Sequence, residues 1–434
     1  RNYIINIIRD NFSKFGFNPI ETPSFERSET LLGKYGQEGE RLIFKILKSG
    51  DFLKGIDGKD FEYLNLAPKI VDKALRYDLT VPFARYVVQN QNNINIPFKR
   101  YQIQNVWRAD RPQKGRYREF LQCDADVIGS KSMMQEIDFI SLFDSVFNDL
   151  NIEGCVIKIN SRKLLFAICE INNCLDKFGA LTNQLDKLDK TDANVVKNNL
   201  IDNGFDKKII DSLFEIIKLS KNFNDNLEEM KSYFKSSDIG LEAISDIEYI
   251  FNYFSKNKLT KSNLVFDIGL ARGIDYYTGV IFEVLPPKTI SLGSIAGGGR
   301  YDNLTEIFGL KNMSGIGISF GLDRLFLVMD ELKLFPVTSY NSVKVLILNF
   351  GVSFSYDLIE IANLLRSNKV NAEFYPDAIP LKKQLNYANK NDIPYVIFYG
   401  DEEKEKNCYN LKEMKTGKQE ILDKEKLIKI LVRN

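Results

Sequence analysis

The sequence predicts a multidomain α/β protein, and three observations support this. The chain has 434 residues, more than one hydrophobic core usually serves. Short strand-type runs alternate with segments of helical spacing in both outer parts of the chain. Between residues 162 and 262, by contrast, Leu, Ile, Lys, Asp and Asn recur at helical spacing almost without glycine or proline. We therefore expect a helical domain inserted into one α/β domain, with a further α/β domain behind it.

The first part of the expected α/β domain is residues 1–161. Apolar residues recur at helical spacing up to about residue 15, and Gly16 predicts a helix stop before a strand at residues 17–20. Because this helical pattern is already under way at Arg1, we expect the native chain to extend further at its amino end. Strand-type runs follow at residues 42–46, 98–104 and 125–129.

Strand character returns after the helical insertion, which we place at residues 162–262. The runs at residues 264–268, 281–285 and 316–320 predict that the first domain resumes over residues 263–335. Residues 336–342 are the expected linker. Residues 343–434 then show a strand, a helix through residues 358–365, and further strands at residues 372–374 and 394–398, which predict a small α/β domain with a parallel sheet.

Composition excludes several classes of function. The formal net charge is +1, so a nucleic-acid partner would be held by local basic patches. The chain contains no histidine, which excludes Ser-His-Asp and Cys-His catalysis. Its five scattered cysteines form no CxxC pair, so we expect neither a zinc site nor a disulfide framework. The apolar runs are too short to cross a bilayer and no signal-peptide core is present, so we expect a cytoplasmic protein.

The densest group of polar residues is the segment 107–120, WRADRPQKGRYREF. Five basic side chains fall within twelve residues, and Pro112 and Gly115 interrupt the run between two flanking strands. Such a loop can receive phosphates, because arginine side chains bind phosphate through paired hydrogen bonds. A solvated basic hairpin explains the same residues, so this segment alone does not decide the function.

Two glycine-rich regions follow the helical insertion. In residues 269–279, Arg272 and the paired Tyr276 and Tyr277 stand between glycines, where they could orient a small polar molecule. A β-turn with packed tyrosines is the plainer alternative. The second region, residues 297–302 and 315–325, is neither a Walker A loop nor a dinucleotide fingerprint, because no Lys-Ser/Thr follows and the order of strand and helix is wrong. A different nucleotide-binding fold is required.

In combination these segments resemble the class II aminoacyl-tRNA synthetases, and specifically the histidyl-tRNA synthetase family. Residues 98–129 resemble motif 2 of the class and residues 315–325 resemble motif 3. Residues 17–23 are similar to motif 1, although the helix that supports it is cut short here. Residues 270–277 resemble the histidine-specific signature, which other members of the class lack. The resemblance covers essentially the whole chain in family order.

The resemblance implies a ligase that activates histidine with ATP to histidyl-adenylate and pyrophosphate, then transfers histidine to the 3′ end of tRNA(His). It implies that Arg108 bridges the α-phosphate and the histidine carboxylate. Asp110 would read the adenine amino group and Phe120 would stack on the adenine ring. Arg116 and Arg324 would hold the outer phosphates, with Mg²⁺ bound mainly through those phosphates and no protein ligand to a metal implied.

The resemblance also implies two groups of histidine-binding residues. Many family members carry Pro-Glu-Gly-Thr at the position of residues 77–80. This chain departs from that pattern there but keeps an acid, Asp78, and a threonine, Thr80. Two fixed polar partners on the imidazole explain how apolar amino acids of similar size are rejected. The ammonium group is matched by Asp78, Thr80 and Gln122, and the imidazole by Asp126, Tyr276 and Tyr277.

Arg272 is the residue expected to act in catalysis beside Arg108. The histidine carboxylate is already a nucleophile, so adenylate formation needs no side-chain base, which suits a chain without histidine. The barrier is lowered by positioning and by cations placed where charge develops. The resemblance implies that Arg272 reaches the α-phosphate from the side opposite Arg108, and that it also contacts histidine.

Residues 343–434 resemble the anticodon-binding domain of the family. The resemblance implies that lysines and Phe374, Tyr375 and Tyr395 contact unstacked anticodon bases, as recognition of single-stranded RNA generally requires. Motif 1 builds the subunit interface of class II enzymes, so a twofold symmetric homodimer is expected.

Two other functions compete with this prediction. The regulatory subunit of ATP phosphoribosyltransferase is a non-catalytic paralogue, but such paralogues usually lack the anticodon domain and parts of the arginine set, both of which this chain has. Another class II synthetase, such as a prolyl or threonyl enzyme, would share motifs 2 and 3. It would not explain residues 272–277.

Overall fold

The computed structural model describes residues 1–33, 35–57, 61–188, 191–220, 223–272, 276–336 and 343–433. The chain forms two compact units, Arg1–Leu334 and Phe335–Asn434. Each unit has its own sheet and its own buried core.

The first unit is built on an eight-stranded sheet with the order β1-β5-β6-β11-β10-β9-β7-β8. The outer pairs β1/β5 and β7/β8 are parallel, whereas all pairs from β5 to β7 are antiparallel. The sheet joins strands from both sides of the helical segment, because β6 pairs with β11 although that segment lies between them in the chain. Its strands are β1 (Asn18–Pro19), β5 (Phe98–Trp107), β6 (Glu119–Ile128), β7 (Cys155–Ser161), β8 (Ser262–Phe266), β9 (Val280–Leu285), β10 (Ala296–Tyr301) and β11 (Gly315–Gly321).

One face of this sheet is covered by three helices, α1 (Asn2–Lys14), α6 (Met134–Asp149) and α13 (Leu322–Glu331). Side chains alternate between the two faces of a strand. In β11 the residue Phe320 points to the helices, where its ring lies 6.1 Å from Phe12, 5.3 Å from Phe143 and 6.0 Å from Phe147 between centroids. Ser319, its neighbour, faces the opposite way. The polar residues of β6 and β11 are therefore left on the face that the three helices do not cover.

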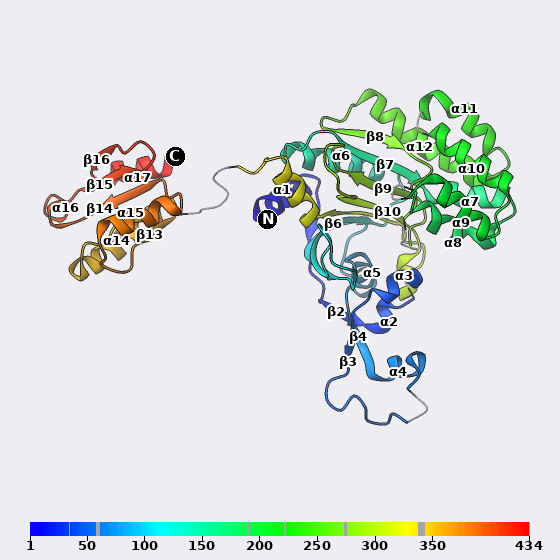
Figure 1. The fold of residues 1–434 in the computed structure, drawn as a ribbon, viewed down its shortest axis with the longest axis horizontal. Coiled ribbons are helices and arrows are strands. Elements are labelled where there is room, and N and C mark those ends of the chain that lie inside the picture. The colour runs from blue at the N-terminus through cyan, green and yellow to red at the C-terminus, as the bar shows by residue number, and fades with distance from the viewer. Residues whose placement is uncertain are drawn as a thin grey trace. The chain divides into compact units, whose positions relative to one another are not determined.

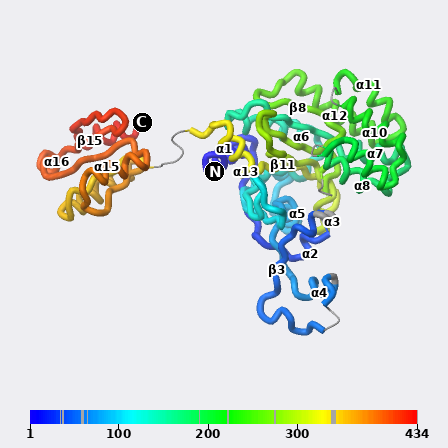
Figure 2. Tube along the Cα trace, in the orientation of Figure 1, coloured from blue at the N-terminus to red at the C-terminus, as the bar shows by residue number. Residues whose placement is uncertain are grey.

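Six helices separate β7 from its parallel neighbour β8, and their path can be followed in Figures 1 and 2. Within this segment α12 packs against α7, and α7 and α12 both contact β7. Two of the helices begin at side-chain caps, Asp192 for α9 and Ser237 for α12. The helices are α7 (Arg162–Ile171), α8 (Phe178–Leu185), α9 (Ala193–Asp202), α10 (Lys207–Ser220), α11 (Phe223–Tyr233) and α12 (Asp238–Lys256), with a 3₁₀ turn η2 (Leu175–Lys177).

A small three-stranded sheet, in the order β2-β4-β3, lies before β5 in the chain. Both of its strand pairs are antiparallel, and Figure 1 shows β3 and α4 extending away from the main sheet. The chain passes from β4 through Asp78 into α5, so the position of this sheet fixes the position of the first turn of α5. The elements are β2 (Phe25–Arg27), α2 (Ser28–Leu31), α3 (Gly36–Arg41), β3 (Lys45–Leu47), α4 (Tyr63–Ile70), β4 (Val71–Leu75), α5 (Thr80–Gln89) and, later in the chain, η3 (Leu304–Phe308).

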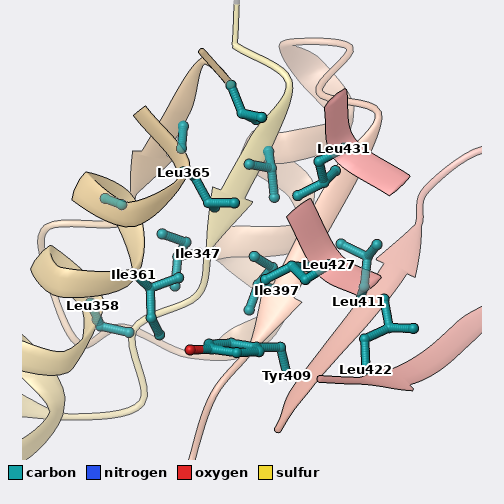
Figure 3. Packing of buried hydrophobic residues seen from close by; sticks show 14 of the residues in the cluster. Ile347, Leu358, Ile361, Leu365, Ile397, Tyr409, Leu411, Leu422, Leu427 and Leu431 are labelled. Atoms are coloured by element: carbon teal, nitrogen blue, oxygen red, sulfur yellow. The ribbon is translucent and has the colours of Figure 1, made fainter. Parts of the chain in front are cut away.

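The second unit has a five-stranded sheet in the order β13-β12-β14-β15-β16. Its strand β12, between β13 and β14, is buried on both faces: Ile347 packs with residues of α14 and α17, as Figure 3 shows, and Leu346 packs with Ala388 of α15. The elements are β12 (Val345–Ile347), η5 (Val352–Phe354), α14 (Ser355–Ser367), β13 (Ala372–Phe374), α15 (Leu381–Lys390), β14 (Tyr395–Phe398), α16 (Asp401–Glu405), β15 (Tyr409–Glu413), β16 (Gln419–Leu422) and α17 (Lys424–Arg433).

Most elements expected from periodicity are confirmed, and two expectations are wrong in detail. The run at residues 42–46 is a helix end, α3, followed by β3 from Lys45. The sheet of the second unit is mixed: β13, β12 and β14 are parallel, but β15 and β16 add an antiparallel hairpin whose charged residues hide its strand pattern. The glycine-rich residues Gly297–Arg300, for which the sequence analysis predicted no element, lie in strand β10. Of the expected linker, residues 337–342 lie outside the described residues.

Candidate active site

A cavity of about 510 Å³ opens on the sheet face that bears the polar residues of β6 and β11. Its wall is made by the β5–β6 hairpin, by β10 and β11, by the chain before α5, and by the start of α13. Eleven of the twelve predicted site residues line it: Asp78, Thr80, Arg108, Asp110, Arg116, Phe120, Gln122, Arg272, Tyr276, Tyr277 and Arg324. The twelfth, Asp126, does not line the cavity.

Arg108 is held in place by its neighbours and not by an acidic partner. Its Nε donates to the Tyr77 carbonyl oxygen at 3.1 Å, and its guanidinium lies 4.2 Å from the Tyr77 ring and 5.2 Å from the Phe120 ring, measured to the centroids. Contacts of this kind orient the cation without an ion pair to it, and its charge lowers the pKa of Asp78 in the same cavity. Arg108 is therefore positioned to receive an anion in the cavity.

Arg324 supplies a second cation on the same wall. Its Nε donates to the Gly115 carbonyl oxygen at 3.2 Å, and its Nη1 donates to the Ser294 carbonyl. Burial lowers the pKa of Arg324, and the charges of Arg116 and Arg108 lower it further. The charges of Glu283 and Asp110 act in the opposite direction, so this part of the cavity combines three arginines with two carboxylates, and the arginines can pair with a polyphosphate.

Asp110 and Arg116 lie together at the mouth of the basic hairpin. The Arg116 Nη1 is 3.6 Å from an Asp110 carboxylate oxygen, and the Arg116 side chain is partly exposed. Such a pair is weak because solvent screens it. Both side chains can therefore change partners when a ligand with phosphates and an amino group enters.

Asp78 lines the same cavity as a buried carboxylate. It accepts hydrogen bonds from the hydroxyls of Tyr35 and Tyr276, both at 2.9 Å, and from the Val81 backbone N–H at 3.1 Å. The side chain is buried, and burial raises its pKa although these donors oppose the rise. Asp78 is therefore a buried carboxylate fixed by three donors, and it lines the cavity together with Thr80.

Arg272 crosses the sheet face beside β10. Its Nη1 donates to the Phe282 carbonyl oxygen at 2.9 Å, and its guanidinium lies 5.8 Å from the centroid of the Tyr277 ring. A Cβ atom on Gly297 would stand 2.1 Å from that Nη1. Only glycine at position 297 leaves this path open, which gives the glycine-rich strand a physical role. Gly273, Ile274 and Asp275, which follow in the signature, lie outside the described residues.

Asp126 sits one layer beneath the cavity. The Tyr301 hydroxyl donates to its Oδ1 at 2.6 Å, and its Oδ2 is 2.7 Å from Arg100 Nη2, a charge contact in which the N–H groups do not aim at the oxygen. A Cβ on Gly317 would be 2.0 Å from Oδ1, so the carboxylate packs against the β11 backbone. The family resemblance named Asp126 but did not show how deep the side chain lies.

Asp124 was missed by the sequence prediction and lies on the cavity wall. It stands between Gln122 and Asp126 on β6, so all three share one face. The alternation of side chains between the two faces of a strand is the sequence signal that would have identified Asp124. Gln122 itself is oriented by donating from Nε2 to the Ser319 hydroxyl at 2.8 Å.

Two further observations bear on cofactors and location. Among the described residues there is no group of three or more Cys, Asp or Glu arranged to hold a metal ion, and the five cysteines are free, four of them buried. None of the helices in the described ranges is both long and apolar enough to span a bilayer.

An antiparallel sheet that carries an arginine-rich hairpin, a buried ammonium-type site and a cation-lined cavity between them defines a class II aminoacyl-tRNA synthetase. The model of the histidyl-tRNA synthetase family matches residues 64–325, and that of an anticodon-binding domain matches residues 343–434. The chain belongs to the histidyl-tRNA synthetase family.

Relatives agree over the full length of the chain. The histidine–tRNA ligase of Christiangramia forsetii is 52% identical over 427 residues, covering 98% of this chain and 93% of the relative. That of Flavobacterium johnsoniae is 48% identical, covering 100% and 95%. The crystal structure of histidyl-tRNA synthetase from Nostoc sp. PCC 7120 is similar with a TM-score of 0.82 at 26% identity, covering 100% of this chain and 95% of that one.

Proposed function

We propose that this chain is a histidine–tRNA ligase and that the cavity of its first unit carries out both steps of the reaction. Histidine and ATP form histidyl-adenylate and pyrophosphate, and histidine is then transferred to the 3′ end of tRNA(His). The observation that carries the proposal is the joining of two chemically opposite regions in one cavity. Asp78 and its tyrosines suit an amino acid, and the cluster of Arg108, Arg116 and Arg324 suits a polyphosphate.

In the first step a carboxylate oxygen of histidine forms a bond to the α-phosphorus as the bond from that phosphorus to the pyrophosphate oxygen breaks. No proton is transferred, so no general base is needed. Arg108 and Arg272 would act on opposite sides of the α-phosphate, stabilising the charge that develops there. Arg108 is oriented by Tyr77 and Phe120, and Arg272 by the Phe282 carbonyl, so both are pre-positioned.

Histidine would be recognised at two groups, its ammonium group and its imidazole ring. The ammonium group would meet Asp78 and Thr80, with the Gln122 Oε1, which has no hydrogen-bond partner within the described ranges, as a third acceptor. Tyr277 and the β6 carboxylates would surround the imidazole. An apolar side chain of the same size would leave these buried polar groups without partners.

ATP would lie along the cationic wall. Phe120 would stack on adenine, Asp110 would accept from its amino group, and Arg116 and Arg324 would hold the outer phosphates. Mg²⁺ would be bound mainly through phosphate oxygens and would share their charge. Glu283 lines the cavity and its charge raises the pKa of Arg324, so an oxygen donor of the type that Mg²⁺ prefers lies beside the phosphate position.

The tRNA would use both units. We assign residues 1–161 and 263–335 to the catalytic domain, residues 162–262 to a helical insertion, and residues 343–434 to anticodon binding. All three predicted anticodon-contacting aromatics, Phe374, Tyr375 and Tyr395, are partly buried against the core clusters of the second unit, so each would contact a base only through the exposed part of its ring. We further assign a twofold homodimer and a cytoplasmic location.

The deciding experiment is ATP–pyrophosphate exchange with each amino acid in turn, for the wild type and Arg272→Ala. Histidine alone should stimulate exchange, and the variant should lose about 100-fold or more in kcat, in the range seen when one transition-state donor is removed, with little change in ATP binding. Arg27→Ala, an exposed arginine of β2, is the matched control. No exchange by a folded dimer would favour the regulatory paralogue. Exchange with another amino acid would overturn the pocket assignment.

A further inference from the structure

One residue that supports the amino-acid site comes from a segment outside all of the family motifs. Tyr35 lies between α2 and α3, is 1% exposed and does not line the cavity. Its hydroxyl nevertheless donates to Asp78 Oδ1 at 2.9 Å, across 43 positions of the chain. Its ring lies 4.7 Å from the Tyr77 ring and 6.4 Å from the Tyr276 ring, between centroids. Tyr35 therefore contacts the residues of the site from outside the cavity.

The two oxygens of Asp78 have different hydrogen-bond partners. Oδ1 accepts from Tyr35 and, at 3.1 Å, from the Val81 backbone N–H, so both of its lone pairs are occupied. Oδ2 accepts from the Tyr276 hydroxyl at 2.9 Å, and Tyr276 lines the cavity. Oδ2 is therefore the oxygen that keeps a lone pair for a ligand, and the carboxylate cannot rotate without breaking the two bonds at Oδ1.

We propose that Tyr35 is a positioning residue for the ammonium group of histidine and that it acts through Asp78. The inference rests on the proposed function and deepens it. By occupying Oδ1, the Tyr35 hydroxyl keeps Oδ2 directed to the ligand. The strength of a hydrogen bond between an ammonium group and a carboxylate depends on distance and angle, so a displaced carboxylate binds histidine more weakly.

The protonation state of Asp78 gives Tyr35 a second effect on the site. Burial raises the pKa of Asp78, and the hydrogen bonds from Val81, Tyr35 and Tyr276 lower it. Burial also raises the pKa of Tyr35, so its hydroxyl stays protonated and can donate at neutral pH. The hydroxyl therefore favours the ionised carboxylate, which is the form that pairs with an ammonium group.

The segment that carries Tyr35 also contacts the basic hairpin. Leu42, the residue that follows α3, accepts the Ala109 backbone N–H at its carbonyl oxygen at 2.8 Å. Tyr77, against which the Tyr35 ring packs, holds Arg108 through its carbonyl oxygen and its ring. The ring of Tyr35 thus supports the residues beneath Arg108, whereas its hydroxyl bonds Asp78. Removing the hydroxyl alone separates these two contributions.

The test compares Tyr35→Phe with the wild type in the full-length chain, with Tyr249→Phe on the exposed side of α12 as the matched control. Phenylalanine keeps the ring in the core cluster that Tyr35 shares with Tyr77. In ATP–pyrophosphate exchange, the KM for histidine should rise about 10-fold, the lower end for a hydrogen bond to a charged group. The KM for ATP should change less than about 2-fold. An unchanged KM for histidine, or an equal rise in both KM values, would overturn the proposal.

Two analogues of histidine separate an effect on the ammonium group from a general effect on the cavity. Histidinol keeps the ammonium group and lacks the carboxylate, whereas 3-(imidazol-4-yl)propanoate keeps the ring and the carboxylate and lacks the ammonium group. For inhibition of exchange by histidinol, Tyr35→Phe should raise the Ki by about the same 10-fold. The Ki for the propanoate should change less than about 2-fold. Equal weakening of both inhibitors would show that Tyr35 only supports the fold.

Failure of the proposed function gives a different result. A wild type without histidine-dependent exchange would contradict the proposed function and not this inference. Calorimetric titration of histidine into the wild type and Tyr35→Phe then tests the role of Tyr35 without turnover. Histidine binding that is weaker in the variant by about the same 10-fold supports the proposal, and equal binding by both proteins contradicts it.

Discussion

At the scale of single residues, the site depends on how each buried polar atom is satisfied. Arg108 is oriented by two aromatic rings and a carbonyl, so its charge stays available to a ligand. Asp78 is fixed by three donors. Asp124 keeps one oxygen without a partner among the described residues. A group left unsatisfied in a native structure commonly marks a site where function is favoured over stability.

Asp124 should therefore make stability depend on pH. Its pKa is about 7 in the folded chain and roughly 3.9 in an unfolded chain. Between these values the folded state binds the extra proton, so stability falls as pH rises from about 4 to about 7 and stays lower above it. Asp124→Asn removes the buried charge, and its Tm should exceed that of the wild type at pH 8 by more than at pH 5. A variant less stable than the wild type at pH 8 would contradict this.

At the scale of elements, strands position the polar side chains of the site, and glycines leave space for those side chains. β10 and β11 lie side by side in the sheet centre, and the cavity is built over them. Gly297 of β10 admits Arg272, and Gly317 of β11 admits Asp126. The segment carrying Arg272 and the strand that accommodates it are joined only by tertiary structure.

Gly297→Ala should therefore impair catalysis through Arg272. The added Cβ would lie 2.1 Å from Arg272 Nη1 and 2.9 Å from the Phe282 carbonyl oxygen, which breaks the hydrogen bond that orients the guanidinium. We expect kcat for ATP–pyrophosphate exchange to fall at least about 10-fold, toward the value for Arg272→Ala. Gly179→Ala in α8, where a Cβ meets nothing within 4 Å, is the control and should keep full activity. Equal turnover by the two variants would show that Gly297 does not position Arg272.

At the scale of the whole molecule, the two units have separate cores, and the cavity belongs to the first of them. Every residue that lines the cavity belongs to the first unit, up to Arg324. The second unit has its own sheet with apolar clusters on both faces. Amino-acid activation should therefore be separable from recognition of the tRNA.

A chain ending at Leu334 should keep histidine-dependent ATP–pyrophosphate exchange within about a few-fold of the full chain, because its core and cavity are complete. Charging of tRNA(His) should fall by about 10-fold or more, because contacts to single-stranded anticodon bases each contribute on the order of 1–3 kcal/mol. Exchange and aminoacylation assays on the same preparation check both parts. Unchanged charging would exclude an anticodon role for the second unit.

The sequence alone determined which residues face the same way and which segments belong to one family. Helical spacing predicted the helices from Arg162 onward, and the family resemblance named eleven residues that line one cavity, nine of them in three motifs. These signals are local, because side-chain direction follows the backbone period. The tertiary structure alone decided depth and contact: that Asp126 does not line the cavity, that Gly297 leaves space for Arg272, and that Asp78 meets Tyr276 across 198 positions. Such facts depend on how strands from distant parts of the chain pair and pack, which no local pattern encodes.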